Sequence, residues 1–141
     1  MKRLRNIIVA GIIVGVVLLC CAFGSKPSYT KSVKNFMAAL QTGEVDAAYD
    51  GLLTNPAWAA QQQQVAALKQ QTQKALTLYG QLLGYEFVKE QKYGKSLVRL
   101  VYIIKSEQKP LTWEFYFYKA NSDWQMVNFN FNDKYDLLAD K

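Results

Sequence analysis

The chain has 141 residues, of which 50% are hydrophobic and 20% are charged, which is the composition of a globular domain and not of a disordered protein. Three of its 17 basic residues precede residue 25, which leaves 14 basic against 11 acidic residues, so the net charge of +6 falls to +3 for the rest of the chain. Such a weak and scattered positive charge argues against a basic stripe, and we expect no nucleic-acid partner.

The first 24 residues are predicted to be an export segment. A basic start with Lys2, Arg3 and Arg5 precedes an uncharged apolar run, Ile7–Phe23. This length lies between that of a signal-peptide core and that of a membrane span, so a cleaved signal peptide and a retained membrane anchor remain alternatives. Both place the domain of residues 25–141 outside the cytoplasm, as a periplasmic, secreted or membrane-anchored domain that meets the membrane only through the N-terminal segment.

Both cysteines, Cys20 and Cys21, lie inside this apolar run. Lipid attachment to either one is a weaker alternative, because the preceding residue is Leu19 or Cys20 where a small residue is expected. The domain itself has no thiol for a disulfide or a zinc site, and the chain has no histidine. We therefore expect a domain stabilised by its hydrophobic core, with no metal and no cofactor.

Three helices are predicted to follow. Apolar residues at three- and four-residue spacing predict a helix over Tyr29–Thr42, with Gly43 as its stop, and a shorter helix over residues 45–52. Asn55 and Pro56 then form the start signal of a long helix, which runs towards Gly80 and Gly84. Its apolar face is predicted to consist of Val65, Leu68, Thr72, Ala75, Leu76, Tyr79 and Leu83.

Four runs of alternating aromatic and β-branched residues come next and predict an antiparallel meander. The runs are Tyr85–Gln91, Leu97–Lys105, Leu111–Lys119 and Trp124–Phe131. Helices followed by a meander give an α+β fold, in which the three helices pack on one face of a four-stranded sheet. The predicted helix-facing residues of the last three strands are Val98, Leu100, Tyr102, Ile104, Trp113, Phe115, Phe117, Val127, Phe129 and Phe131.

This order of elements resembles a known family. The pattern Phe36-x-x-x-Leu40-x-x-Gly43-x-x-x-x-Ala48-Tyr49, with the long helix, the meander and a last strand that begins at Trp124, is similar to the nuclear transport factor 2-like, or cystatin-like, α+β cone. The resemblance covers about residues 29–133 and is closest to small exported bacterial members of undefined function. It implies a curved sheet wrapped around a long helix, with a cavity at the open end, but it implies no reaction.

The preferred functional prediction is a non-catalytic binding or protein-interaction module with an aromatic cavity between the helices and the sheet. The predicted cavity-lining residues are Tyr49, Tyr79, Tyr102 and Trp113. Their apolar bodies and polar tips suit a small amphipathic ligand, although packing in the core explains the same residues.

The alternative is an isomerase-like or hydrolytic enzyme. Without histidine, the general base would be a strand carboxylate, and Glu114 shares its predicted face with Tyr116 and Tyr118. That face is opposite to the helix-facing one, so the simpler interpretation is a hydrated glutamate beside two tyrosines.

The same opposite face predicts a partner, because it carries more apolar residues than a water-facing sheet needs. The predicted interface residues are Val101, Ile103, Tyr116, Tyr118, Trp124 and Met126. We expect a homodimer or another protein to cover this face. A monomer whose own curvature or C-terminal tail covers it remains the alternative.

Overall fold

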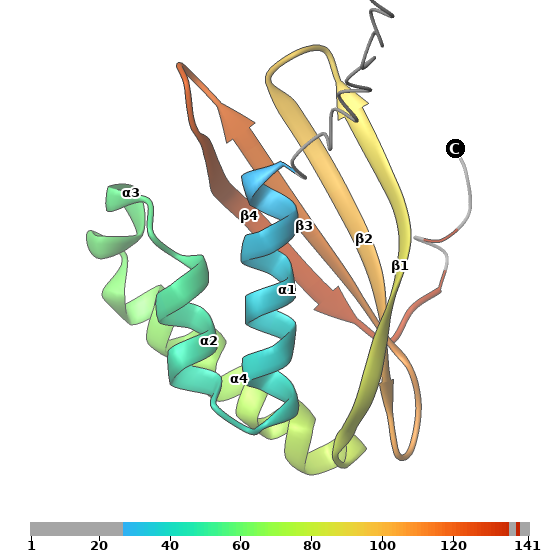
Figure 1. Ribbon diagram of the computed structural model, residues 1–141. Coiled ribbons are helices and arrows are strands. Elements are labelled where there is room, and N and C mark those ends of the chain that lie inside the picture. The colour runs from blue at the N-terminus through green and yellow to red at the C-terminus, as the bar shows by residue number, and fades with distance from the viewer. Residues whose placement is uncertain (1–26, 136–137, 139–141) are drawn as a thin grey trace, which may run out of the picture.

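The sheet has the strand order β1-β2-β3-β4, with every neighbouring pair antiparallel, and four helices precede it in the chain. The computed structural model describes residues 27–135 and residue 138, so the predicted export segment and both cysteines lie outside the described residues. All four helices lie on one side of the open sheet (Figure 1). The α+β class and the meander topology are therefore as predicted.

The helices are α1 (Ser28–Gln41), α2 (Val45–Leu52), α3 (Pro56–Ala59) and α4 (Gln62–Tyr79). The prediction of three helices is wrong, because the third is interrupted at residues 60 and 61. Its start is as predicted, since the Asn55 side chain accepts a hydrogen bond from the Ala57 amide at 2.9 Å. We attribute the break to Trp58, whose indole donates to the Met126 carbonyl at 3.0 Å and ties α3 to the sheet.

The strands are β1 (Leu82–Tyr93), β2 (Leu97–Ser106), β3 (Leu111–Lys119) and β4 (Trp124–Asn132). The bounds of β3 agree with the prediction, and those of β2 and β4 differ by one residue. β1 begins three residues earlier than expected, because Gly80 at φ +82° ends α4 and turns the chain into the sheet. Leu83, predicted on the long helix, is consequently a strand residue that is 61% exposed.

The core lies between α1, α2 and the face of the sheet that the helices cover. α1 contributes five buried residues, and the predicted helix-facing residues of β2 and β3 are all buried. Aromatic rings from helix and sheet meet in this core, as where the Phe36 ring lies 5.3 Å from those of Tyr49 and Trp113. These edge and tilted ring contacts stabilise the packing of the helices on the sheet by more than the burial of apolar surface alone would.

The predicted assignment of side chains to the two sheet faces is wrong in the first part of β4, because the strand contains a bulge. Tyr116 pairs with Asn128 while the next residue, Phe117, pairs with Met126, so Val127 has no partner in β3. An extra residue reverses the alternation of side chains on one side of it. Val127 is therefore 39% exposed although it was predicted in the core, and Met126 is 3% exposed although it was predicted on the opposite face.

Trp124 moves with Met126 to the helix side. Its ring contacts that of Tyr29 in α1, with centroids 5.2 Å apart. Neither residue lies on the sheet face where a protein interface was predicted.

Candidate functional site

α4 is the helix that is packed least. Only Thr72 is buried among its 18 residues, whereas five of the 14 residues in α1 are buried. The remaining residues of its predicted apolar face are partly exposed: Val65, Leu68, Ala75, Leu76 and Tyr79. The apolar stripe of α4 is thus present in the sequence but only half used by the fold.

Polar contacts hold one side of α4 against α2. The Tyr49 hydroxyl and Thr72 Oγ1 are 2.6 Å apart, and this hydrogen bond is buried. One turn earlier, Lys69 Nζ lies 2.8 Å from Asp50 Oδ1 and 3.1 Å from Asp46 Oδ1. These contacts fix the position of the helix without closing its other side, which faces β4.

The C-terminal end of α4 is fixed by the turn between β2 and β3. The Gln108 amide donates to the Tyr79 carbonyl at 3.1 Å, and the Gln81 amide donates to Glu107 Oε2 at 3.2 Å. A side chain at Gly80 would place its Cβ 2.4 Å from the same Glu107 oxygen, which would have to shift, and the φ of +82° favours glycine here.

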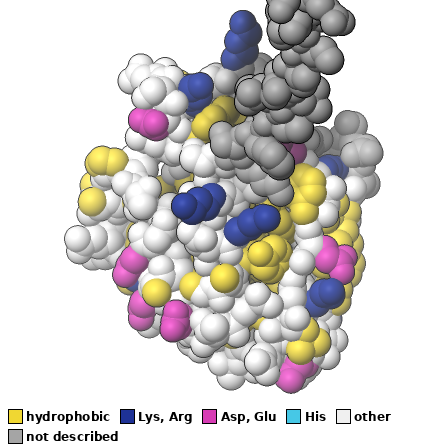
Figure 2. Space-filling view, viewed as in Figure 1, with side chains coloured by type: hydrophobic (Ala, Val, Ile, Leu, Met, Phe, Trp, Pro, Cys, Tyr) yellow, Lys and Arg dark blue, Asp and Glu magenta, His cyan; other side chains and the backbone are white. Residues whose placement is uncertain are grey.

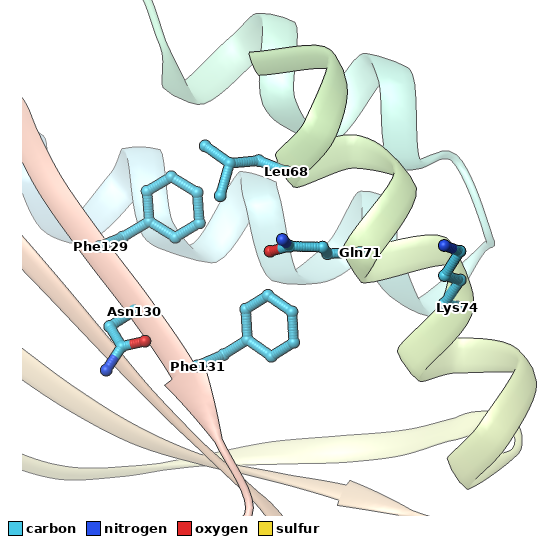
Figure 3. A pocket seen from close by; sticks show the side chains of 6 residues that line it. All are labelled: Leu68, Gln71, Lys74, Phe129, Asn130 and Phe131. Atoms are coloured by element: carbon cyan, nitrogen blue, oxygen red, sulfur yellow. The ribbon is translucent and has the colours of Figure 1, made fainter. Parts of the chain in front are cut away.

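A groove separates α4 from β4 (Figure 3). Its first part has a volume of about 360 Å³, and a second part of about 320 Å³ shares Lys74 and Phe131 with it. We call the two together the α4–β4 groove. Its lining residues are Leu68, Gln71, Lys74, Ala75, Leu78, Tyr79, Leu111, Phe129, Asn130, Phe131, Asn132 and Asp133.

The middle of the groove is apolar with one amide. Leu68 and Gln71 point from α4 towards Phe129 and Phe131 of β4, while Asn130 points to the other side of the strand (Figure 3). Trp113 supports this wall from the core, because its ring is stacked on that of Phe131 at 4.6 Å with an interplanar angle of 13°. A ring that is stacked on one face and open on the other offers a flat apolar surface to a ligand.

The charged side chains around the groove leave an excess of positive charge. At one end Lys109 forms an ion pair with Asp133, which lowers the pKa of that carboxyl, and the Lys109 ammonium also lies 5.0 Å from the centre of the Tyr79 ring. Lys74, which lines both parts of the groove, has no ion pair within the described part of the chain. The field in the groove therefore favours an anion.

The predicted cavity residues are placed mostly in the core. Tyr49, Tyr102 and Trp113 are each at most 2% exposed, and only Tyr79 lines the groove. Burial raises the pKa of the Tyr49 phenol to about 12, against the opposing effect of its hydrogen bond with Thr72. Trp113 Nε1 is the buried side-chain nitrogen that finds no hydrogen-bond partner among the described residues.

The groove itself was missed by the sequence reasoning. Leu68, Phe129 and Phe131 were identified as apolar, but they were assigned to the core. One signal could have indicated the groove: β4 has no charged residue in nine positions and is the last strand of the meander, so its outer edge had no predicted strand to cover it.

Glu114, the predicted base of the enzyme alternative, is not a hydrated side chain. It is 4% exposed, its Oε2 accepts from Arg99 Nε at 2.6 Å, and the Tyr116 hydroxyl donates to the same oxygen at 2.9 Å. Burial and then this hydrogen bond raise the pKa of Tyr116. The carboxylate is occupied by two donors on the sheet face away from the helices, an arrangement that suits a structural ion pair.

The predicted interface face is less apolar than expected once Trp124 and Met126 are removed from it. Val101 is fully buried, Tyr116 is held by Glu114, and Tyr118 remains 45% exposed. Self-association through this face stays a prediction.

Comparisons with protein-family models, with curated protein sequences and with solved structures found no match. No group of three or more acidic, cysteine or histidine side chains that could hold a metal ion is found among residues 27–135. None of the described helices is long and apolar enough to cross a membrane.

Proposed function

We propose that this protein is an exported, non-catalytic binding module, and that the α4–β4 groove holds a small amphipathic anion with a flat apolar body. The observation that carries the proposal is the partly exposed ring of Phe131, with the largely buried Phe129 beside it, opposite the half-buried stripe of α4. The apolar body lies between Phe131 and Leu68, and the anionic group lies towards Lys74 and the Gln71 amide.

The size of the groove supports a small molecule. Ligand pockets commonly have volumes of roughly 300–1,000 Å³ and combine apolar walls with a few polar groups. Covering about 150 Å² of apolar surface would contribute about 4 kcal/mol before the cost of association. Because about 4 kcal/mol corresponds to a dissociation constant of about 1 mM, we expect dissociation constants in the millimolar range for simple ligands.

The chemistry of the lining residues supports binding without catalysis. Asp133 is the carboxylate that lines the groove, and it is paired with Lys109. The chain has no histidine, and Glu114 lies on the other sheet face. The groove thus offers no free general base to a bound molecule.

The resemblance to the nuclear transport factor 2-like cone remains our proposal for the family. It predicts a cavity beside a long helix at the open end of a curved sheet, which is the kind of place that the groove occupies beside α4. The helix packed most deeply against this sheet is α1, so side chains fill the space between α1 and the sheet, and the groove lies beside α4.

The test uses the full-length chain in lipid nanodiscs and two aromatic carboxylates as probes, indole-3-acetate and 2-naphthoate. Binding is measured by saturation-transfer NMR, with the uncharged amide of each probe as its partner. We expect the carboxylates to bind several-fold more tightly than the amides, and Lys74→Gln to remove this difference. Lys34→Gln, at an exposed cation of α1, is the matched control and should change nothing.

A second variant blocks the groove without touching the core. Gln71 is exposed on α4, so Gln71→Trp should fill the space in front of Phe131 and lower the affinity at least tenfold while the fold is kept. Failure of both carboxylates to bind at millimolar concentration, or binding that Gln71→Trp leaves unchanged, would contradict the proposal.

A further inference from the structure

The start of α1 and the tips of two hairpins form one end of the domain. β1 ends at Tyr93, β3 ends at Lys119, and the Tyr29 ring of α1 lies 5.6 Å from that of Phe117 near the end of β3. The Tyr29 hydroxyl also donates to Glu90 near the end of β1, at 3.1 Å. We call this the α1 end, and Figure 1 shows the β1–β2 and β3–β4 turns on the same side as the start of α1.

Two aromatic side chains are exposed at the α1 end. Tyr93 is 48% exposed and Tyr118 is 45% exposed, and both pair with Leu97 of β2 from its two sides. Residues that pair with the same residue point to the same sheet face, so the two phenols lie there together. Tyrosine has an apolar body and a polar tip, and it is enriched where proteins meet the headgroup layer of a membrane.

The charge at the α1 end is positive. Its basic residues are Lys31, Lys92, Lys95 and Lys119. Its acidic residues are Glu90, which pairs with Lys92 at 3.3 Å and accepts from Tyr29, and Asp123, which accepts from Ser122 at 2.9 Å.

The opposite end carries the exposed acidic residues Glu44 and Glu107, and its cations Lys105 and Lys109 are paired with Glu86 and Asp133. In Figure 2 most of the visible acidic side chains lie in the lower half of the molecule and most of the basic ones in the upper half, which contains the α1 end.

The length of the chain before α1 limits where this end can lie. The apolar run stops at Phe23 and α1 begins at Ser28, so Gly24–Pro27 are the only residues between them. Four residues span at most about 14 Å when fully extended. If the run is retained as a membrane anchor, the α1 end lies within reach of the headgroups, which extend roughly 6 Å from the hydrocarbon core.

We propose that the α1 end rests on the surface of an anionic phospholipid bilayer, with Tyr93 and Tyr118 among the headgroups and the lysines against the phosphates. Each lysine near an anionic surface is attracted to it, and the anchor keeps the end at high effective concentration. This inference rests on retention of the anchor and not on a ligand in the groove. It also leaves the Asp133 end of the groove on the side away from the membrane.

The test measures how close each end of the domain lies to the bilayer, with two nitroxide labels placed in equivalent hairpin turns. In the full-length chain with Cys20 and Cys21 changed to alanine, Ser96→Cys labels the β1–β2 turn at the α1 end, and Gln108→Cys labels the β2–β3 turn at the opposite end. Both residues are exposed. The chain is reconstituted into phosphatidylcholine liposomes with and without phosphatidylglycerol, and collision with a water-soluble nickel chelate is measured by electron paramagnetic resonance.

We expect the label at residue 96 to be protected from the chelate several-fold more than the label at residue 108, and more so with phosphatidylglycerol. Lys95→Glu with Lys119→Glu should remove that dependence on phosphatidylglycerol, and high salt should weaken it. Equal collision rates at the two labels in anionic liposomes would overturn the proposal. So would a mature protein that begins near residue 25, because the anchor would then be absent.

Discussion

α1 and α4 lie on the same side of one sheet and are packed there to different degrees. α1 fully buries Tyr29, Val33, Phe36, Met37 and Leu40. α4 fully buries one threonine, and its apolar residues are only partly buried against the core, beside a few polar contacts. Burial of apolar side chains closes the space between two elements, because every gap forfeits contacts. A helix whose apolar residues are only partly buried leaves space beside it, and the space beside α4 is the groove.

The two helices should therefore respond differently to truncation. Phe36→Ala removes a ring that contacts Tyr49, Trp113 and Phe115, and we expect it to lower the free energy of unfolding by about 3–5 kcal/mol. Leu68→Ala in the groove should cost less, about 1–2 kcal/mol, because Leu68 is only partly buried. Chemical denaturation followed by tryptophan fluorescence measures both, and equal losses would show that α4 is packed as tightly as α1.

The burial of the Tyr49 phenol predicts an alkaline limit of stability. The pKa of Tyr49 is raised from 10.0 to about 12 in the folded state, so between these values the folded protein binds more protons than the unfolded chain. Stability is fully present below pH 10 and falls by roughly 2–3 kcal/mol as the pH rises to 12.

Tyr49→Phe should remove this part of the pH dependence and leave the Thr72 hydroxyl without its partner, at a cost of about 1–2 kcal/mol at neutral pH. Denaturation at several pH values compares the two proteins. A profile between pH 10 and 12 that the substitution does not change would show that Tyr49 is not the titrating group. In the Tyr49→Phe variant, exchange of the backbone amide hydrogens should speed up more in α4 than in α1.

The ion pairs of Lys69 should contribute least. Asp46 and Asp50 are mostly exposed, so Lys69→Gln is expected to lower the free energy of unfolding by about 0.5 kcal/mol or less, and less still in high salt. A decrease in the free energy of unfolding of more than about 1 kcal/mol would mean that the ion pairs of Lys69, and not the contact between Tyr49 and Thr72, hold the middle of α4 in place.

The sequence by itself determined the order of the elements and the buried face of the central strands. Val98, Leu100, Trp113 and Phe115 alternate without interruption, and a period of two residues assigns them to one face whatever covers it. The turn residues between the strands were equally local signals, which is why the bounds of β3 were predicted correctly.

Only the tertiary structure decided the bulge in β4, the break before α4 and the packing of the predicted cavity residues. The bulge at Val127 depends on how β4 pairs with β3, and the break before α4 depends on where Trp58 reaches Met126. Whether Tyr49 and Trp113 line a cavity or fill it depends on how closely α1 approaches the sheet. These are contacts between residues far apart in the chain, and the spacing of residues along one element carries no information about them.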